Sequence, residues 1–445
     1  MSRTAPAGLA ERQASPAAVA AAARIGILAG GGRLPLTIAE SVIARGGSVH
    51  IVAIEGEADA SVARFPHTWV NWGQVGRMVA TLRERADALV IAGGVRRPDL
   101  WKLRPDLGFF LSLPQILQML AGGDDSVLSR VVRFFEAKGI VVRGAHEVAP
   151  DLLTLGGPAG ALALDGQGRA DAELGFAVRA ALGPLDAGQA VVVAGGKVLA
   201  IEGAEGTDAM LARVAGLRGA NGGGQHSGVL AKGPKPGQEL RVDMPAIGPR
   251  TVAAAADAGL AGLAVEAGAV LLLDRAEAVE AADTRGLAVE GLAHAAVPQV
   301  GPTMVDPPPV RVAGRLHPTR RDETDIAKGL AAVERLAPFD TGQAVVVSRA
   351  YVLAIAAAEP ASAMLDRTRA LRQWGVGAKR RVGVLTCRAG AAAGAEALLH
   401  GAAAAGLAGV AVTGPPAALA AFETPGAIAA ADSDGLVLVT RGERA

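Results

Sequence analysis

Lysines, glycines and prolines gather in one stretch of the 445-residue chain, Gly228–Gly248, which reads GVLAKGPKPGQELRVDMPAIG and contains the carboxylate of Asp243. Its prolines remove backbone donors and fix φ, so we predict an ordered loop in its middle. Polar groups on a stiffened loop suit a functional site, and the same composition suits a solvated surface connection. The stretch alone leaves both interpretations open.

A second group of oxygen-bearing side chains lies in EGTDAM, just before a predicted helix. Thr207 or Asp208 could cap that helix, which would explain one of them. Together with Glu205 they also form a partial shell for Mg²⁺, which prefers carboxylate and phosphate oxygens. This motif therefore has both a structural and a metal-binding interpretation.

Glycine turns follow two predicted strands in the N-terminal part of the chain. Gly30–Gly32 lie in AGGGRLP before a predicted helix, and Gly93 begins GGVRRPD. Alternating strands and helices predict a mostly parallel, doubly wound α/β domain up to residue 148. Glycines at the carboxyl ends of such strands bind phosphate on backbone N–H groups, although a plain tight turn has the same composition. Arg96 and Arg97 could grip a phosphate or simply be solvated.

Two further polar motifs belong to this domain. Asp124 and Asp125 precede a helix, where capping is the structural interpretation. His146 and Glu147, in GAHEV, follow a strand predicted at Ile140–Arg143 and could act in acid–base chemistry.

The last third of the chain repeats the middle third. PLDAGQAVVVAGGKVLAIE (184–202) returns as PFDTGQAVVVSRAYVLAIA (338–356), and GVLAK, AGLAGLAV and DTRGLAV return in the same order. We therefore predict six segments. They are a disordered extension (1–23), an N-terminal domain (24–148), a linker (149–170), a second α/β domain (171–291), a linker (292–322) and a degenerate copy of the second domain (323–445).

What the second copy lacks is informative about function. It has no Thr–Asp pair in place of EGTDAM and no counterpart of KGPKPGQELRVDMPAIG. Strand-forming residues survived in the copy while the polar cluster did not. This difference indicates that Glu205, Asp208 and Asp243 serve chemistry in the first copy.

Composition excludes several classes of protein. Lys plus Arg (44) balances Asp plus Glu (43), so no nucleic-acid-binding surface is indicated. The single cysteine, Cys387, allows neither an internal disulfide nor a cysteine metal site and fits a reducing compartment. No segment reaches the ~20 apolar residues of a membrane span, so we predict a cytoplasmic protein.

With these motifs in place, the chain resembles the LpxI family of UDP-2,3-diacylglucosamine diphosphatases, enzymes of lipid A biosynthesis. The resemblance covers about Ile25–Gly291 and rests on AGGGRLP, GGVRRPD, GDD, GAHEV, EGTDAM and GVLAKGPKPGQELRVDMPAIGP, in that order. A typical family loop reads GNVSRPD, and here Gly94 and Arg96 replace its Asn and Ser. The extra repeat is not part of the family pattern.

The resemblance implies a Rossmann-like N-terminal domain and an α/β catalytic domain. It also implies hydrolysis of the UDP-linked lipid to UMP and 2,3-diacylglucosamine 1-phosphate (lipid X) with Mg²⁺ or another divalent cation. The enzyme would be cytosolic and meet its lipid at the inner membrane face. An essential aspartate of the family maps to Asp243. We hypothesise that Asp243 binds the metal or orients the attacking water, that Asp208 and Glu205 complete the shell, and that Lys232 and Lys235 hold phosphate oxygens.

The full set of predicted site residues follows from these motifs. Asp243, Asp208 and Glu205 are predicted to be catalytic, with Asp243 and Asp208 on the metal. The residues predicted to bind substrate are Gly30, Gly31, Gly32, Leu34, Pro35, Gly93, Arg97, Asp124, Asp125, His146, Glu147, Thr207, Lys232, Lys235 and Gln238.

Two other functions stay open at this point. A nucleotide-dependent dehydrogenase would need a glycine at Leu34 and an acidic ribose-binding residue, for which Glu55 alone is weak. A non-catalytic nucleotide-sugar- or lipid-binding protein of the same fold is the second alternative. For the degenerate copy we predict a structural or dimer-forming role.

Overall fold

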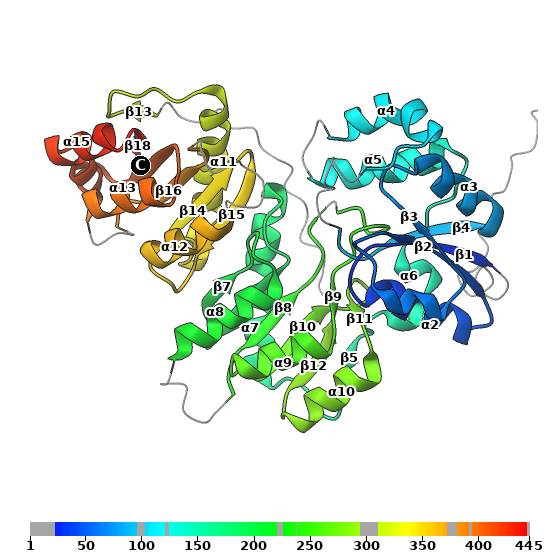
Figure 1. Cartoon of the computed structure of the whole chain (residues 1–445). Helices are drawn as coiled ribbons and strands as arrows, with labels where there is room; N and C mark the ends of the chain where they lie inside the picture. Colours follow the sequence, from blue (N-terminus) through cyan, green and yellow to red (C-terminus); the bar gives the residue numbers. More distant parts are fainter. Residues whose placement is uncertain are drawn as a thin grey trace, which may run out of the picture. The chain divides into compact units, whose positions relative to one another are not determined.

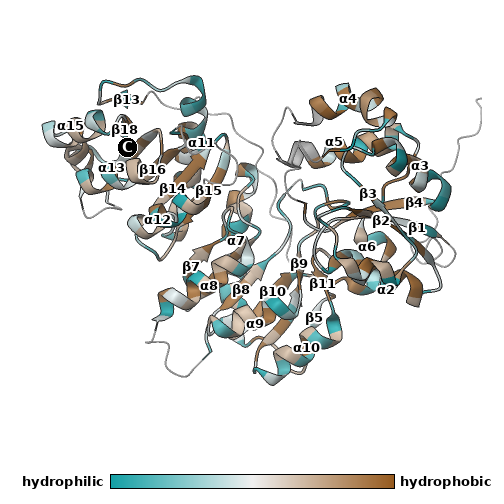
Figure 2. Ribbon diagram, in the orientation of Figure 1, coloured by the Kyte–Doolittle hydropathy of each residue, from teal (hydrophilic) through white to brown (hydrophobic). Residues whose placement is uncertain are grey.

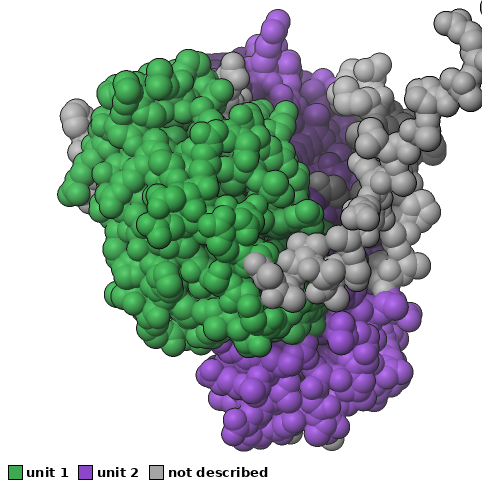
Figure 3. Space-filling view, turned by 90° about the vertical axis from the view of Figure 1, so that its right-hand side faces the viewer, with its two compact units in different colours: residues 1–153, 239–244 green, residues 154–238, 245–445 purple. Residues whose placement is uncertain are grey.

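The computed structural model of the chain describes residues 23–95, 103–120, 124–219, 226–236, 238–293, 310–371, 381–390 and 394–442, with the side chains of 118–127 outside the described part. The chain forms two compact units (Figure 3). Unit 1 contains residues 1–153 and 239–244, and unit 2 contains residues 154–238 and 245–445.

Unit 1 is built on a four-stranded parallel sheet in the order β3-β2-β1-β4 (Figure 1). Its strands are β1 (Arg24–Ala29), β2 (Ser48–Ile54), β3 (His67–Val70) and β4 (Ala88–Ala92). Short runs of β-branched and apolar residues such as SVHIVAI form these strands, because a sheet buried on both faces favours continuous hydrophobicity. The expected parallel α/β class is confirmed.

Helices connect and cover the strands of unit 1. They are α2 (Leu34–Ala44), α3 (Val75–Arg85), α4 (Leu107–Leu120), α5 (Asp124–Ala137) and α6 (Ala145–Val148). One apolar core joins the sheet to α3 and α5, with Val52, Leu82 and Phe135 among its buried members. The α5 side chains at this contact follow helical spacing, which is why the sequence pattern there is amphipathic.

Unit 2 contains two six-stranded sheets. The first has the order β5-β12-β10-β8-β6-β7. Its strands are β5 (Gly157–Pro158), β6 (Ala190–Ala194), β7 (Lys197–Ile201), β8 (Val229–Lys232), β10 (Gly262–Glu266) and β12 (Ala288–Leu292), and its helices are α7 (Gly166–Leu182), α8 (Thr207–Arg218), α9 (Pro249–Asp257) and α10 (Arg275–Thr284). Strands β8, β10 and β12 are parallel, and β6 runs antiparallel to β8. A two-stranded parallel pair, β9 (Ala246–Ile247) and β11 (Leu271–Leu272), accompanies them.

The second sheet repeats the first strand for strand, in the order β13-β18-β17-β16-β14-β15. Its strands are β13 (Arg311–Val312), β14 (Ala344–Ser348), β15 (Tyr351–Ala356), β16 (Val384–Arg388), β17 (Gly409–Gly414) and β18 (Val437–Gly442), and its main helices are α11 (Arg320–Leu336), α12 (Ala361–Leu371), α13 (Ala395–Ala404) and α15 (Pro425–Ser433). Even the irregularity after Val192 in β6 recurs after Val346 in β14. We call residues 154–238 with 245–293 copy 1, and residues 310–442 copy 2.

Three local expectations differ from the structure. Ile140–Arg143 is not a strand, since only Val142 bridges to Leu89. The segment expected to be a linker at 149–170 contains β5 and the first turn of α7, because Gly157 and Pro158 extend the first sheet next to β12. Helix α4 has no counterpart among the predicted elements. Among the described residues, no helix is both long and apolar enough to cross a membrane.

Candidate active site

The two glycine turns of unit 1 lie beside each other, because β1 and β4 are neighbouring strands. The Gly31 N–H donates to the Gly94 carbonyl at 2.7 Å, and the Gly94 N–H donates back to Gly31 at 3.0 Å. A Cβ on Gly30 would stand 2.5 Å from the carbonyl oxygen of Gly94. A Cβ on Gly93, whose φ is +92°, would stand 2.6 Å from that of Gly31. This close approach of two backbones requires glycine.

Helix α2 begins directly after the first glycine turn. Leu34 opens the helix and Pro35 occupies its first turn, where a missing N–H costs nothing. Carboxyl ends of strands at a reversal of strand order, next to a helix N-terminus, are where open α/β sheets bind anionic groups. Arg97 lies outside the described residues, and Asp124 and Asp125 open α5 with side chains outside the described part.

Asp243 belongs to unit 1, although its sequence neighbours belong to unit 2. Its segment, 239–244, lies against the GAHEV turn, since a Cβ on Gly144 would be 3.3 Å from the Cα of Arg241. The guanidinium of Arg241 also binds the Glu136 carboxylate of α5 at 2.8 Å. Contacts between residues far apart in the sequence therefore make Asp243 part of the N-terminal unit.

Within this segment an ion pair holds the backbone. Arg241 binds both carboxylate oxygens of Glu239, at 2.8 and 2.7 Å, and this pairing lowers the pKa of Glu239. The N–H of Asp243 donates to the Glu239 carbonyl at 3.0 Å. The local conformation that presents Asp243 is thus set by residues two and four positions before it.

The two candidate residues of the GAHEV turn, His146 and Glu147, have different hydrogen-bonding environments. Glu147 accepts from the N–H of Gly144 at 2.6 Å and pairs with Arg143 at 3.0 Å, so it caps the short helix α6. The Nδ1 atom of His146 is buried and has no hydrogen-bond partner among the described residues. In this turn Glu147 is therefore engaged in capping, whereas one ring nitrogen of His146 has no hydrogen-bond partner among the described residues.

A buried polar triad lies at the end of β8 in unit 2. The Lys232 ammonium donates to Thr207 Oγ1 at 3.0 Å and to the Ala246 carbonyl at 2.9 Å, and Thr207 donates to Glu202 at 3.1 Å. Lys232 and Glu202 are 6% and 9% exposed. Burial lowers the pKa of Lys232 and raises that of Glu202, since a low-dielectric site disfavours both charged forms.

Asp208 and Glu205 lie at the start of α8 in different surroundings. Asp208 is half exposed and pairs with the exposed Arg250 at 2.6 Å. The Glu205 side chain is 7% exposed, binds Arg213 at 2.7 Å and lies 3.4 Å from Arg367 of copy 2. A carboxylate held between two guanidinium groups is not open to a metal ion. We therefore assign Glu205 a structural role in place of the catalytic one expected from the sequence.

Lys235 and Gln238 shape the loop after β8. The Gln238 side chain accepts from the Lys235 N–H at 2.8 Å, and the Lys235 ammonium binds Asp186 at 2.6 Å. These contacts give both residues a structural function in this conformation. The prolines between and before them stiffen the same turn, as the sequence predicts.

Buried Arg179 is a loop-holding residue that the sequence analysis missed. Its guanidinium donates to the Pro234 carbonyl and binds Glu266, at the end of β10, at 2.6 Å. Gly233 has no room for a side chain because a Cβ there would be 2.7 Å from Glu266 and 2.9 Å from Arg179. The proline-rich loop is thereby tied to α7 and β10.

Copy 2 replaces the triad with apolar residues. Lys232 faces Ala190 in the sheet as Cys387 faces Ala344, which aligns the two positions. By the same strand and helix positions, Ala356 stands for Glu202 and Ala361 for Thr207. All three replacements are buried. A fold that is stable with Ala, Ala and Cys does not need the triad for packing.

Glu202 is the member of the triad that the sequence analysis did not single out. Its signal is present in the repeat, where KVLAIE ends in Glu202 and YVLAIA ends in Ala356. A charged residue opposite alanine at the end of a buried strand is the kind of difference that marks chemistry.

These contacts leave fewer carboxylates for the expected metal site. Among the described residues, no group of three His, Cys, Asp or Glu side chains is placed to hold a metal ion. Mg²⁺ is usually bound by one or two carboxylates together with substrate phosphates and water, so a three-carboxylate shell is not required. With Glu205 engaged in ion pairs, Asp243 and Asp208 remain the predicted metal ligands.

Comparison with known proteins matches nearly the whole described chain. The LpxI N-terminal domain matches residues 24–152, and the LpxI C-terminal domain matches twice, at residues 156–290 and 309–439. The chain is 42% identical over 272 residues to the UDP-2,3-diacylglucosamine pyrophosphatase LpxI of Caulobacter vibrioides. That match covers 60% of this chain and 97% of the relative.

Proposed function

Because this chain belongs to the LpxI family, we propose that it hydrolyses the pyrophosphate of UDP-2,3-diacylglucosamine to UMP and 2,3-diacylglucosamine 1-phosphate. The observation that carries this proposal is the 42% identity to the pyrophosphatase over 97% of its length. Copy 1 has Glu202, Thr207 and Lys232 where copy 2 has buried apolar residues. This difference supports a catalytic rather than a purely binding role.

The glycine turns and the N-terminus of α2 are the proposed site for phosphate or nucleotide. Backbone N–H groups at a helix N-terminus favour negative charge. The tight pairing of Gly31 with Gly94 supports this role, since it keeps the turn rigid before a ligand arrives. His146, with its buried Nδ1, is a second proposed substrate contact.

Lys232 is the proposed cation for a phosphate oxygen. Two of the three donors of its ammonium are used by Thr207 and Ala246, so its position is fixed. Glu202 supports its positive charge through Thr207, whereas burial opposes it. A lysine held in this way binds phosphate as a point charge.

Asp243 is the proposed general base that orients the attacking water. A divalent cation, bound by Asp243 or Asp208 together with phosphate oxygens, would supply neutralisation of the pyrophosphate charge. The Glu239–Arg241 pair supports this assignment, because it fixes the backbone of the segment that carries Asp243.

The test is hydrolysis of the diacylated substrate by the purified full chain with Mg²⁺, in water enriched in heavy oxygen. We expect UMP release, with the position of the heavy oxygen identifying the attacked phosphorus. Asp243→Asn should fold normally and lose roughly 10²–10⁴-fold in rate. Asp257→Asn, an exposed aspartate at the end of α9, is the matched control. Full activity of Asp243→Asn would refute its role, and no UMP from the wild type would refute the function.

Helix α4 supports a further proposal, transient contact with the inner membrane face. Its sequence, LGFFLSLPQILQML, contains no charged residue, and its apolar colouring is visible in Figure 2. Leu107, Phe110, Leu111 and Leu117 are 57–75% exposed. An exposed apolar helix face of this kind is typical of proteins that dock on lipid.

Vesicle sedimentation tests this contact. Leu111→Ser should lower the fraction of protein bound to phosphatidylethanolamine–phosphatidylglycerol vesicles and leave hydrolysis of detergent-dissolved substrate unchanged. Val141→Ser, at another exposed apolar position of unit 1, should change neither. Equal vesicle binding by both variants would refute the role of α4.

A further inference from the structure

Copies 1 and 2 share one apolar core inside unit 2. Most of its buried residues come from α7, β6 and β7 of copy 1 and from α11, β14 and β15 of copy 2. They form equivalent pairs, namely Val178 and Ala332, Leu182 and Leu336, Val191 and Val345, Val193 and Val347, Val198 and Val352, and Ile201 and Ile355. Each copy thus contributes the same face to the contact, as in a two-fold symmetric dimer.

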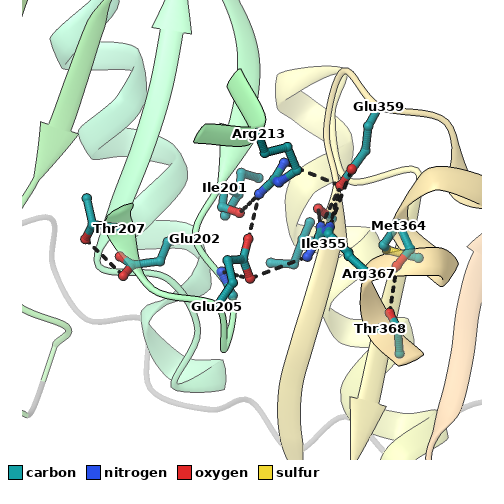
Figure 4. A network of polar contacts seen from close by, with 11 residues as sticks. Ile201, Glu202, Glu205, Thr207, Arg213, Ile355, Glu359, Met364, Arg367 and Thr368 are labelled. Carbon is teal, nitrogen blue, oxygen red and sulfur yellow. Dashed lines mark hydrogen bonds and ion pairs between the residues drawn. The ribbon is translucent and has the colours of Figure 1, made fainter. Parts of the chain in front are cut away.

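A buried ion-pair network has the same symmetry (Figure 4). Within copy 1, Arg213 binds Glu205 at 2.7 Å, and within copy 2, Arg367 binds Glu359 at 2.5 Å. Across the contact, Arg213 lies 3.4 Å from Glu359 and Arg367 lies 3.4 Å from Glu205. Two carboxylates and two guanidinium groups therefore neutralise one another away from solvent.

Backbone hydrogen bonds cross the contact in matching pairs. The Ala204 N–H donates to the Leu353 carbonyl at 3.0 Å, and the Ala358 N–H donates to the Leu199 carbonyl at 3.3 Å. Gly203 lies so close to copy 2 that a Cβ there would be 2.5 Å from the Leu353 carbonyl oxygen. The segment before α8, which links Glu202 to Thr207, is therefore held by copy 2.

Divergence of the two copies has been selective. The residues of the symmetric contact keep their chemistry, as Glu205 and Arg213 do in Glu359 and Arg367. The triad that includes Lys232 has become apolar in copy 2. Selection for the contact without selection for the triad explains both observations, whereas drift of a functionless duplicate would erode the buried charges as well.

We infer that copy 2 is a built-in partner domain. It occupies the face of copy 1 that a second copy of that domain would occupy in a two-fold dimer. It also positions the segment 202–206, which carries Glu202 and leads into Thr207. The partner is thus a domain of this chain. Copy 2 acts on the reaction through Glu205 and the backbone of this segment, so its residues are positioning residues.

Hydrogen exchange of the full chain tests the inference without reference to substrate. In the wild type, the amides of Ala204 and Ala358 should be protected, since each donates across the contact. Glu359→Gln leaves two guanidinium groups with one carboxylate and should speed exchange at both amides by about tenfold or more. Glu423→Gln is the matched control, because Glu423 binds Arg311 at the opposite edge of the second sheet.

Several outcomes would overturn the inference. Unprotected amides at Ala204 and Ala358 in the wild type would do so, as would equal exchange in the Glu359 and Glu423 variants. If Glu359→Gln unfolds copy 2, seen as lost protection of β17, Glu205→Gln replaces it and should act on Ala358 from the other side. Glu359→Asp should restore protection. Loss of turnover in Glu359→Gln rests on the proposed function, and the exchange result stands apart from it.

Discussion

Replacing Lys232 by methionine tests the buried triad most sharply. The substitution keeps much of the side-chain volume and removes the ammonium that faces Thr207, the neighbour of Glu202. Without the ammonium the buried Glu202 carboxylate loses its nearby positive charge, and an uncompensated buried charge costs about 3–5 kcal/mol. Glu202 can limit this loss by taking up a proton, which at pH 7 costs about 3.7 kcal/mol for a carboxyl of ordinary pKa near 4.3. The cost of protonating Glu202 thus falls within the range expected for leaving its charge uncompensated, so Lys232→Met should be less stable by about 3–4 kcal/mol at pH 7.

The sign of the pH dependence follows from the raised pKa of Glu202, whose main cause is burial. In Lys232→Met the folded pKa lies above the unfolded value. The protonated group therefore contributes stability that is present below about pH 4.3 and is lost as pH rises, by about 1.4 kcal/mol per unit, up to the folded pKa. The double variant Lys232→Met, Glu202→Gln should lack this slope and regain stability.

The assay is the free energy of opening of β8, measured from amide exchange of Leu230 and Ala231 between pH 5 and 8, since a chain with several domains does not unfold in one step. Activity should fall in both variants. A flat profile in Lys232→Met would refute the reasoning, because it would mean that Glu202 stays ionised in the folded variant. Wild-type turnover in the double variant would refute the role of Lys232 in phosphate binding.

Three other perturbations have defined outcomes. Gly30→Ala should destabilise unit 1 by about 1–3 kcal/mol, because its Cβ would stand 2.5 Å from the Gly94 carbonyl. Amide exchange of β1 checks this beside Gly94→Ala, which has open space around its Cβ. Glu239 has a pKa lowered by its hydrogen bond to Arg241, so its contribution to stability is present above its unfolded pKa of about 4.3 and is lost as pH falls. Glu239→Gln should therefore be less stable than wild type at pH 7 and equal to it in acid, and a constant difference would contradict the cause. Asp208→Asn should raise the Mg²⁺ concentration for half-maximal rate, on the order of tenfold, if its carboxylate binds the cation; an unchanged Mg²⁺ titration would remove it from the metal site.

Local sequence patterns are sufficient to predict the α/β architecture and the repeat. Ala88–Ala92 is apolar over its whole length and Ser48–Ile54 over its last four residues, and such runs have few alternatives to a buried parallel strand. The glycine turns could be placed at a common edge for the same reason, since parallel strands end on one side of a sheet. Segments with little periodicity, such as Ile140–Arg143, were assigned wrongly because a single bridge leaves no pattern.

Charged residues carry no local information about their partners. Glu205 and Asp208 lie in one short motif, yet one is enclosed by Arg213 and Arg367 and the other is half exposed. One of the two partners of Glu205, Arg367, comes from a distant part of the chain. Only folding decides which carboxylate is neutralised and which can meet a ligand.

The segment around Asp243 shows the same division. Its prolines and its absence from copy 2 identify it as a special loop, and those signals are local. That residues 239–244 join the N-terminal unit is a tertiary result, produced by contacts with Glu136 and the GAHEV turn. Sequence periodicity reports which face of an element is buried, whereas long-range ion pairs and packing decide which element it is buried against.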